Sequence, residues 1–260
     1  MNISVVIPLL NEKESLVELT DSLNDVMKSY NFSYEIIFID DGSSDNSWDI
    51  IEELSSKSNT IKGIKFHRNY GKSQALHVGF LKSRGQVVFT MDADLQDDPK
   101  EIYKLYNMIK DNNYDLVSGW KKVRHDPWTK TLPSKIFNFF TRILTGVKIH
   151  DFNCGLKIYR KSVIKTLDIY GGRHRYIPAL AGQKKFTVSE IIVNHRARKF
   201  GNTKYGGRRF FHGFFDLISV LFLSRYLQSP LYFFGQLGLL SFIAGFFICL
   251  LYTSPSPRDS

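Results

Sequence analysis

The sequence predicts an α/β protein with a mostly parallel sheet, followed by an apolar helix long enough to cross a membrane. Three observations support this prediction. Short β-rich apolar runs alternate with longer segments of helical period, two of the runs end in acidic clusters, and a long uncharged stretch lies near the end of the chain. Such alternation is typical of right-handed strand–helix–strand units, which build parallel sheets.

The elements can be placed from these patterns. Expected strands cover residues 3–8, 35–40, 61–67, 86–91 and 115–119, and the helices between them cover 12–29, 44–56, 72–83 and 99–110. The pattern is less regular afterwards, with a helix expected over 134–145 and strands over 156–159 and 187–195. In sheets of this kind, ligands bind beyond the carboxyl ends of the strands.

The composition is that of a globular protein. With 260 residues, 43% apolar and 23% charged side chains, the chain can form one large domain with a core. These values exclude a disordered chain and a polytopic membrane protein. The two cysteines, Cys154 and Cys249, lie far apart, so a disulfide scaffold is also excluded and a reducing compartment is expected.

The net charge of +10 is unevenly distributed along the chain. Residues 1–118 hold 12 basic and 19 acidic side chains, whereas residues 119–260 hold 23 basic and 6 acidic side chains. An acidic half suits metal and nucleotide binding, and a basic half suits phosphates and an anionic bilayer. The basic half lacks the interleaved aromatic and basic residues of a nucleic-acid platform, so we expect no nucleic-acid partner.

The last part of the sequence indicates a membrane anchor. Residues 210–227 mix Phe and Leu with basic side chains, as an interfacial helix does, and residues 231–252 would span about 33 Å as a helix. We therefore expect a catalytic domain over 1–205, an interfacial helix over 206–228, a transmembrane helix over 229–252 and a short tail over 253–260. Basic residues gather before the apolar helix, so the domain should face the cytoplasm at the inner membrane.

An acidic loop after the fourth expected strand carries the clearest chemistry. Asp92 and Asp94 are two residues apart, and the Gln96 amide follows. Such oxygen ligands suit Mg²⁺ or Mn²⁺, which would also hold phosphate oxygens. The alternative is a solvated turn in which Asp97 or Asp98 caps the next helix.

Two further clusters could contact a nucleotide and its phosphates. Asp40 and Asp41 end a buried strand, where a base or ribose could donate hydrogen bonds to one of them; the alternative is a turn followed by a helix cap. In the basic half, Arg198 and Lys204 flank a glycine, and Lys121 follows the fifth expected strand. These cations could neutralise a diphosphate, or they could form a solvated face beside a membrane.

Five motifs, in this order along the chain, carry a family resemblance. They are residues 4–8 with Asn11-Glu12, residues 40–45, residues 91–99, residues 150–157, and Arg198-x-x-Gly201-x-Thr203-Lys204. The sequence resembles the family 2 glycosyltransferases. Within them it is similar to the polyprenyl-phosphate glycosyltransferases, namely dolichol-phosphate mannose synthase and the bactoprenol (undecaprenyl-phosphate) glucosyltransferases.

The resemblance implies a GT-A fold, a nucleotide-diphospho-sugar transferase architecture with a metal-dependent donor site. It also implies roles for individual residues. Pro8, Glu12 and Asp41 would bind the base and ribose, with Lys121 also on the donor. Asp92, Asp94 and Gln96 would hold Mg²⁺ or Mn²⁺ and the donor diphosphate. Asp151 would serve the acceptor side, either as a base or by orienting a group, and Arg198 and Lys204 would contact phosphates.

Two positions depart from the family pattern, of which the first keeps its hydroxyl and the second keeps its charge but loses the bidentate geometry of Arg. Thr203 stands where many members have Ser, and Lys121 stands where many have Arg. Many bacterial members also have a second membrane helix, so we expect that the chain is cut short and that its tail over 253–260 is not native.

The function expected from these observations is inverting transfer of a hexose from a nucleotide-sugar donor, of UDP-glucose or GDP-mannose type, to a polyprenyl phosphate. The alternative is a family 2 transferase that acts on a polysaccharide or another non-lipid acceptor. A third hypothesis is a basic membrane-surface or nucleic-acid-binding module without activity, which the intact Asp92-x-Asp94 pair disfavours. The sequence does not decide between a monomer and a homo-oligomer.

Overall fold

The computed structural model describes residues 2–122, 128–167, 169, 173–196, 199 and 230–253. The chain divides into two compact units, Met1–Leu217 and Ile218–Ser260, each of which is considered by itself. The domain bounds expected from the sequence remain predictions. The expected interfacial helix over 206–228 and the tail from 254 onward lie outside the described residues.

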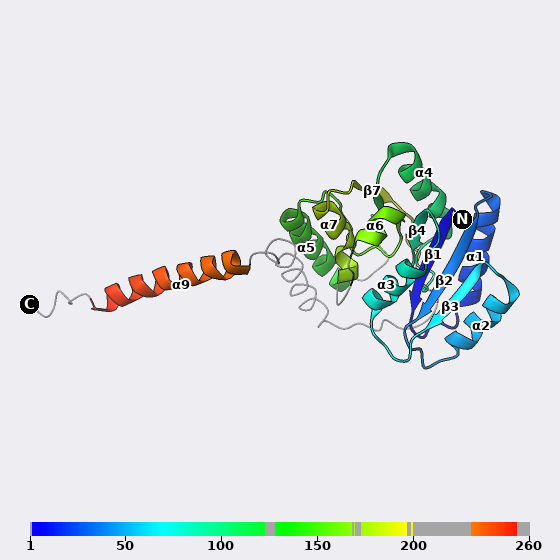
Figure 1. The fold of residues 1–260 in the computed structure, drawn as a ribbon, viewed down its shortest axis with the longest axis horizontal. Helices are drawn as coiled ribbons and strands as arrows, with labels where there is room; N and C mark the ends of the chain where they lie inside the picture. The colour runs from blue at the N-terminus through cyan, green and yellow to red at the C-terminus, as the bar shows by residue number, and fades with distance from the viewer. Residues whose placement is uncertain are drawn as a thin grey trace, which may run out of the picture. The chain divides into compact units, whose positions relative to one another are not determined.

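A seven-stranded sheet forms the centre of the first unit, counted over the residues that the structure describes (Figure 1). Its order is β3-β2-β1-β4-β6-β5-β7. The strands are β1 (Ile3–Leu9), β2 (Tyr34–Asp40), β3 (Ile61–Lys65), β4 (Val87–Thr90), β5 (Leu116–Trp120), β6 (Lys157–Arg160) and β7 (Val188–Ile192). All pairs are parallel except those of β6, which runs antiparallel to both β4 and β5. The predicted mostly parallel α/β architecture is confirmed.

Helices cover both faces of the sheet because its strands are apolar on both sides. Along β1, Val5 and Ile7 belong to one core cluster, whereas Val6 belongs to the other. The first cluster packs against α1 (Leu16–Ser29), α2 (Ser47–Lys57) and α4 (Ile102–Asn112). The second packs against α3 (Lys72–Lys82), α6 (Lys161–Thr166) and α7 (Ile177–Gln183). The remaining elements of this unit are the short helices η1 (Pro99–Glu101) and η2 (Arg173–Tyr176), and α5 (Trp128–Thr145).

Most expected elements are found, with shifted bounds. The helix expected from residue 99 begins as the short helix η1, and α5 begins earlier than expected. The sequence analysis did not predict α6, η2 or α7. All three have seven residues or fewer, which is too short to show a helical period.

The topology brings several loops to one edge of the sheet. The parallel strands β1, β2, β4 and β5 end at this edge, and the antiparallel strand β6 begins there. The loops after Leu9, Asp40, Thr90 and Trp120 and the segment before Lys157 therefore meet. This edge holds the candidate site.

The second unit holds one long helix among its described residues, α9 (Pro230–Thr253). Its segment Leu231–Leu250 has a mean hydropathy of 2.1 and is long enough to cross a membrane. An apolar helix is thus found where the sequence predicts a transmembrane helix over 229–252, and insertion into a membrane remains a prediction.

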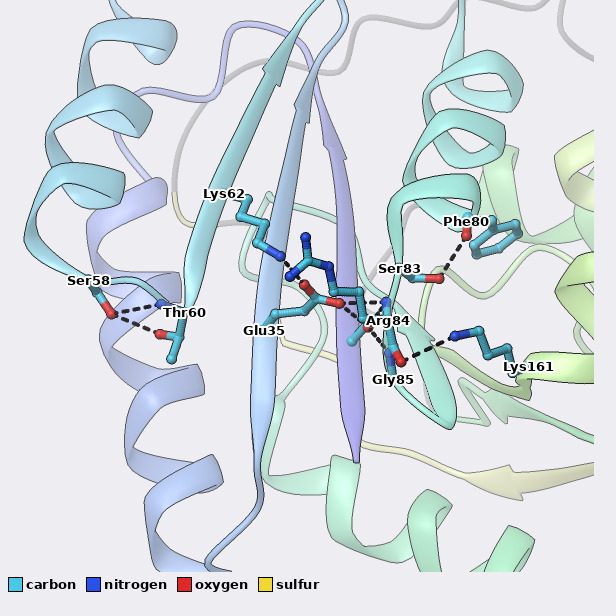
Figure 2. A network of polar contacts seen from close by, with 10 residues as sticks. Glu35, Ser58, Thr60, Lys62, Phe80, Ser83, Arg84, Gly85 and Lys161 are labelled. Carbon is cyan, nitrogen blue, oxygen red and sulfur yellow. Dashed lines mark hydrogen bonds and ion pairs between the residues drawn. The ribbon is translucent and has the colours of Figure 1, made fainter. Parts of the chain in front are cut away.

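A buried carboxylate holds the opposite edge of the sheet together (Figure 2). Glu35, at the start of β2, is fully buried and accepts hydrogen bonds from Ser4 Oγ at 2.7 Å, Lys62 Nζ at 2.5 Å and the Arg84 N–H at 2.6 Å. The Gly85 N–H donates to Ser4 Oγ at 2.8 Å. These contacts join β1, β2, β3 and the turn before β4.

The environment of Glu35 favours its charged form. Burial alone would raise the pKa of this carboxyl, but the hydrogen bonds from Lys62, Ser4 and Arg84 outweigh burial and hold the pKa below its ordinary value of 4.5. The carboxylate therefore stabilises the folded state.

We expect Glu35→Ala to lower the free energy of unfolding by about 2–3 kcal/mol, because it leaves buried donors without an acceptor. Denaturant unfolding in detergent, followed by tryptophan fluorescence, measures this change. Glu53→Ala is the control, because Glu53 pairs with Lys57 at the exposed surface and should matter little. Equal unfolding midpoints for the two variants would contradict the structural role of Glu35.

The same contribution depends on pH. Since the pKa of Glu35 is lower in the folded state, its stabilisation is complete above 4.5 and is lost as the pH falls through the folded value. The difference in stability between the wild type and Glu35→Ala should therefore shrink on acidification below 4.5.

Candidate functional site

The loops after β1 and β2 are bound to each other by side chains. Asn11, at a φ of 52°, accepts the Ser44 N–H at 2.7 Å, and its own N–H donates to Ser43 Oγ at 2.8 Å. The Glu12 N–H donates to Ser47 Oγ at 3.0 Å. Glu12 is thereby placed at the ligand edge beside the end of β2, and its contact with a base or ribose remains a prediction.

The two acidic residues at the end of β2 have different partners. Asp40 accepts the Ser43 N–H at 2.9 Å, so its buried carboxylate shapes the turn, as the turn interpretation predicts. Asp41 accepts the N–H groups of Tyr70 and Gly71, at 2.7 and 2.9 Å, and thus ties the turn to the loop before α3. Burial raises the pKa of Asp41, and the charge of Asp40 adds to this effect.

Gly42 lies in the turn after β2, where it meets the loop before α3. It has a φ of 76°, and a Cβ there would lie 2.6 Å from the Arg68 carbonyl carbon. Both the backbone angle and the close approach of the Arg68 segment require glycine at this position. Asp41 therefore holds a tightly packed wall of the site, and nucleotide binding by Asp41 itself remains a prediction.

The carboxylates of the acidic loop after β4 have different partners within the chain. Asp98 caps η1 by accepting the Lys100 N–H at 3.1 Å, and it pairs with Arg196 at 2.7 Å. Asp97 pairs with Lys121 at 2.8 Å. The helix-capping interpretation therefore holds for Asp98, while Asp92 and Asp94 face different partners.

Asp94 lies at the bend of this loop. Its Oδ1 accepts the Gln96 N–H at 3.2 Å, and Leu95 between them has a φ of 60°. The bend turns Asp94 and Gln96 back toward each other on the same loop as Asp92. Asp92, Asp94 and Gln96 thus share one short loop, and joint metal binding by their side chains remains a prediction.

Asp92 forms an ion pair with Lys72, which is at the first position of α3. Burial would raise the pKa of Asp92, but the positive charges of Lys72, Lys121 and Lys157 hold it well below its ordinary value. Gly155 lies against the same carboxylate, since a Cβ at that position would be 2.5 Å from Asp92 Oδ2. The carboxylate is therefore ionised and fixed from two sides.

Lys121 is more buried than expected of a donor-binding residue. Its side chain is 12% exposed, and its ammonium is held by Asp97. Although burial lowers the pKa of Lys121, the charge of Asp97 outweighs burial and raises it. The direct role that the structure gives to Lys121 is to hold the acidic loop, and contact with the donor stays a prediction.

The acceptor-side residue Asp151 is almost fully buried just before β6. Its Oδ1 accepts the Asn153 N–H at 3.0 Å, and its backbone carbonyl accepts from Ser118 Oγ at 3.3 Å. Beside it, His150 stacks on Trp120 with ring centroids 4.2 Å apart and bonds to Glu190. Asp151 is thus rigidly placed.

A cavity of about 60 Å³ lies beside Asp92, and the segment before β6 and residues at η2 and the start of α7 line its other sides. Its wall includes basic side chains that the sequence analysis did not assign to the site, namely Lys72, Lys157, His174 and Arg175, together with the predicted residue Pro8. Lys157 is 4% exposed, and burial lowers its pKa. The cavity is large enough for a few waters or one small anionic group, but not for a whole nucleotide sugar.

The four basic residues of the cavity wall differ in how far the sequence alone could indicate them. Gly71-Lys72-Ser73 resembles the end of a P-loop but lacks the glycine five positions earlier, so this motif does not by itself indicate phosphate binding by Lys72. Lys157 is part of a motif that carries the resemblance. Nothing in the local sequence around His174 or Arg175 indicates proximity to Asp92.

The acidic loop fits a divalent cation by its chemistry. Asp92, Asp94 and Gln96 offer hard oxygen ligands, which Mg²⁺ and Mn²⁺ prefer. Within the described ranges, no group of three or more His, Cys, Asp or Glu side chains could hold a metal ion. A cation at this loop would therefore need further oxygens, such as those of a diphosphate. Arg198 and Lys204 lie outside the described residues.

Known proteins resemble most of the chain and share its fold. The family model described as "Glycosyl transferase family 2" matches residues 4–168. The dodecaprenyl-phosphate galacturonate synthase of Rhizobium johnstonii (strain DSM 114642 / LMG 32736 / 3841) is 38% identical over 243 residues, which cover 92% of this chain and 72% of that protein.

Solved structures of glucosyl-3-phosphoglycerate synthase from Mycobacterium tuberculosis share the fold. The structure with Mn²⁺ and UDP-glucose has a TM-score of 0.64 at 18% identity and covers 86% of this chain and 78% of that one. The structure with UDP has a TM-score of 0.62 at 18% identity, covering 86% and 79%. The predicted GT-A-like fold is confirmed. The chain belongs to glycosyl transferase family 2 and is a glycosyltransferase.

Proposed function

We propose that this enzyme transfers a sugar of hexose type from a nucleotide-sugar donor to a polyprenyl phosphate at the cytoplasmic face of the inner membrane. The observation that carries the proposal is the cavity in which the ionised Asp92 faces a wall of basic side chains. Such a wall suits an acceptor that is itself an anion. The name of the Rhizobium relative and the apolar helix α9 support a lipid acceptor.

The geometry suggests how the donor is held. Asp92, Asp94 and Gln96 would hold Mg²⁺ or Mn²⁺ together with the donor diphosphate, and when bound the cation would neutralise charge on the departing nucleotide. Lys72 keeps Asp92 charged and oriented. Pro8, Glu12 and Asp41, at the ends of β1 and β2, would contact base and ribose, while Arg198 and Lys204 would contact phosphates.

The chemistry then requires little proton transfer from the protein. A phosphate acceptor is already anionic near neutral pH, so its oxygen can attack the sugar C1 in line with the leaving diphosphate and invert the anomeric centre. Lys157, His174 and Arg175 would orient the acceptor phosphate. Because Asp151 is 1% exposed and accepts a backbone N–H, we assign it an orienting role and not that of a general base.

The metal proposal predicts the behaviour of Asp94→Asn. With radiolabelled nucleotide sugar, EDTA should abolish transfer into lipid extract by the wild type, and Mg²⁺ or Mn²⁺ should restore it. Asp94→Asn should lose about 100-fold or more of this activity because a charged ligand is removed. Asp111→Asn, at an exposed position of α4, is the matched control. Full activity of Asp94→Asn would overturn the proposed metal-dependent mechanism. Incorporation of the radiolabelled sugar into a water-soluble polymer would instead favour a non-lipid acceptor.

The close approach of Gly155 to Asp92 gives a second prediction. Gly155→Ala should push the carboxylate aside and lower kcat/KM for the donor by about tenfold to 100-fold, while the thermal midpoint changes little. Gly238→Ala serves as the control, because a Cβ there would meet nothing within 4 Å. An unchanged kcat/KM in Gly155→Ala would show that the position of Asp92 is not critical.

The basic wall of the cavity gives a third prediction. Arg175→Gln should raise the KM for the polyprenyl phosphate by about tenfold, because a charge-assisted contact to phosphate is lost, and it should leave the KM for the donor within about twofold. Lys184→Gln, exposed at the end of α7, is the control. A change confined to the donor KM would place Arg175 on the donor side instead.

A further inference from the structure

The first turn of α3 contacts two different sides of the cavity. Lys72, the first residue of the helix, pairs with Asp92. The next residue, Ser73, is buried and bonds to His174, which lies in η2 and is 101 residues away in the sequence. Both Lys72 and His174 line the cavity. The start of α3 therefore connects the carboxylate side of the cavity with the segment that supplies His174 and Arg175.

The side chain of Ser73 is bonded to His174 in two ways. Its Oγ accepts the backbone N–H of His174 at 3.1 Å, and the same Oγ lies 2.9 Å from the ring nitrogen Nδ1. Over the part of the chain that the structure describes, the Ser73 hydroxyl has no other hydrogen-bond partner. Ser73 thus fixes both the backbone and the imidazole ring of His174.

This arrangement determines which nitrogen of the neutral ring carries the proton. A serine hydroxyl has a single proton to donate, and Nδ1 is the acceptor within its reach. If Nδ1 carried the ring proton, the hydroxyl of the buried Ser73 would be left without an acceptor, which is unfavourable. The proton of the neutral imidazole therefore belongs on Nε2, on the side of the ring away from Ser73.

A donor nitrogen suits an anionic ligand, because an ionised phosphate oxygen accepts hydrogen bonds and a bare ring nitrogen would repel it. His174 shares the cavity wall with Lys157 and Arg175, and the cavity of about 60 Å³ has room for one small anionic group. We propose that Ser73 is a positioning residue, which holds His174 in the Nε2–H tautomer so that the ring donates a hydrogen bond to a phosphate oxygen in the cavity. That this phosphate belongs to the polyprenyl acceptor rests on the proposed function.

Nitrogen NMR tests the tautomer without requiring any transfer activity. The full chain, labelled with ¹⁵N-histidine, is studied in detergent at about pH 8, where a histidine with the ordinary pKa of about 6.5 is neutral. The signals of His174 are identified by their loss in His174→Ala. We expect a protonated Nε2 and an unprotonated Nδ1 in the wild type, and a mixture of the two tautomers in Ser73→Ala.

Two NMR results would overturn the proposal. A proton on Nδ1 of His174 in the wild type would contradict the assigned tautomer. An unchanged Nε2–H tautomer in Ser73→Ala would mean that another group fixes the ring. Ser83→Ala is the matched control, because Ser83 is also a buried serine of α3, at its other end, where its Oγ donates to the Phe80 carbonyl at 2.7 Å (Figure 2).

Kinetics test the role of the tautomer in binding. Ser73→Ala should raise the KM for the polyprenyl phosphate by about fivefold to tenfold, because the ring no longer presents a fixed donor, and it should leave the KM for the donor within about twofold. Ser83→Ala should leave both KM values within about twofold, although it also loses a buried hydrogen bond. Unchanged KM values for both substrates in Ser73→Ala would overturn the proposal.

A double variant tests whether Ser73 acts through His174. Ser73→Ala combined with His174→Ala should raise the acceptor KM no further than His174→Ala alone, whereas multiplied effects would overturn the positioning role. An increase confined to the donor KM would overturn the assignment of the phosphate to the acceptor. If no sugar reaches a polyprenyl phosphate at all, the proposed function fails, and the NMR result still decides the tautomer of His174.

Discussion

The organisation of this enzyme depends on holding several carboxylates close together within one short loop. Asp92, Asp94, Asp97 and Asp98 follow β4 within seven residues, where their mutual repulsion would otherwise open the loop. Cations from distant parts of the chain hold three of them: Lys72 from α3, Lys121 from the end of β5 and Arg196 from beyond β7. The loop is thus assembled only when both halves of the sheet are in place, which explains why basic residues of the second half belong to the catalytic domain itself.

Much of the architecture could be predicted because its signals are local. The first five strands, the helices between them and the acidic clusters at the ligand edge follow from periodicity and from the rule that parallel strands end at one edge. The antiparallel insertion of β6 between β4 and β5 could not be predicted in this way. Nothing in four residues of sequence specifies their direction, which is fixed by pairing with strands about 40 and 70 residues away.

The candidate site shows the same limit. Asp92, Asp94 and Gln96 are neighbours in sequence, and their proximity needs no knowledge of the fold. By contrast, Lys72 meets Asp92 across 20 residues and Arg175 lines the same cavity from a segment with no strong periodic signal. Sequence reasoning also treated the turn residues Asp97 and Asp98 as equivalent candidates for capping, whereas the structure distinguishes them by which cation each one meets.

The position of the Glu35 network has a consequence for how such enzymes can change over time. This buried network ties four consecutive parts of the sheet at the edge opposite the ligand loops. Stability and recognition therefore depend on separate sets of residues at opposite ends of the same strands. Substitutions that alter donor or acceptor preference can accumulate in the loops without weakening this network, which allows related chains with a common sheet to diverge toward different sugars and acceptors.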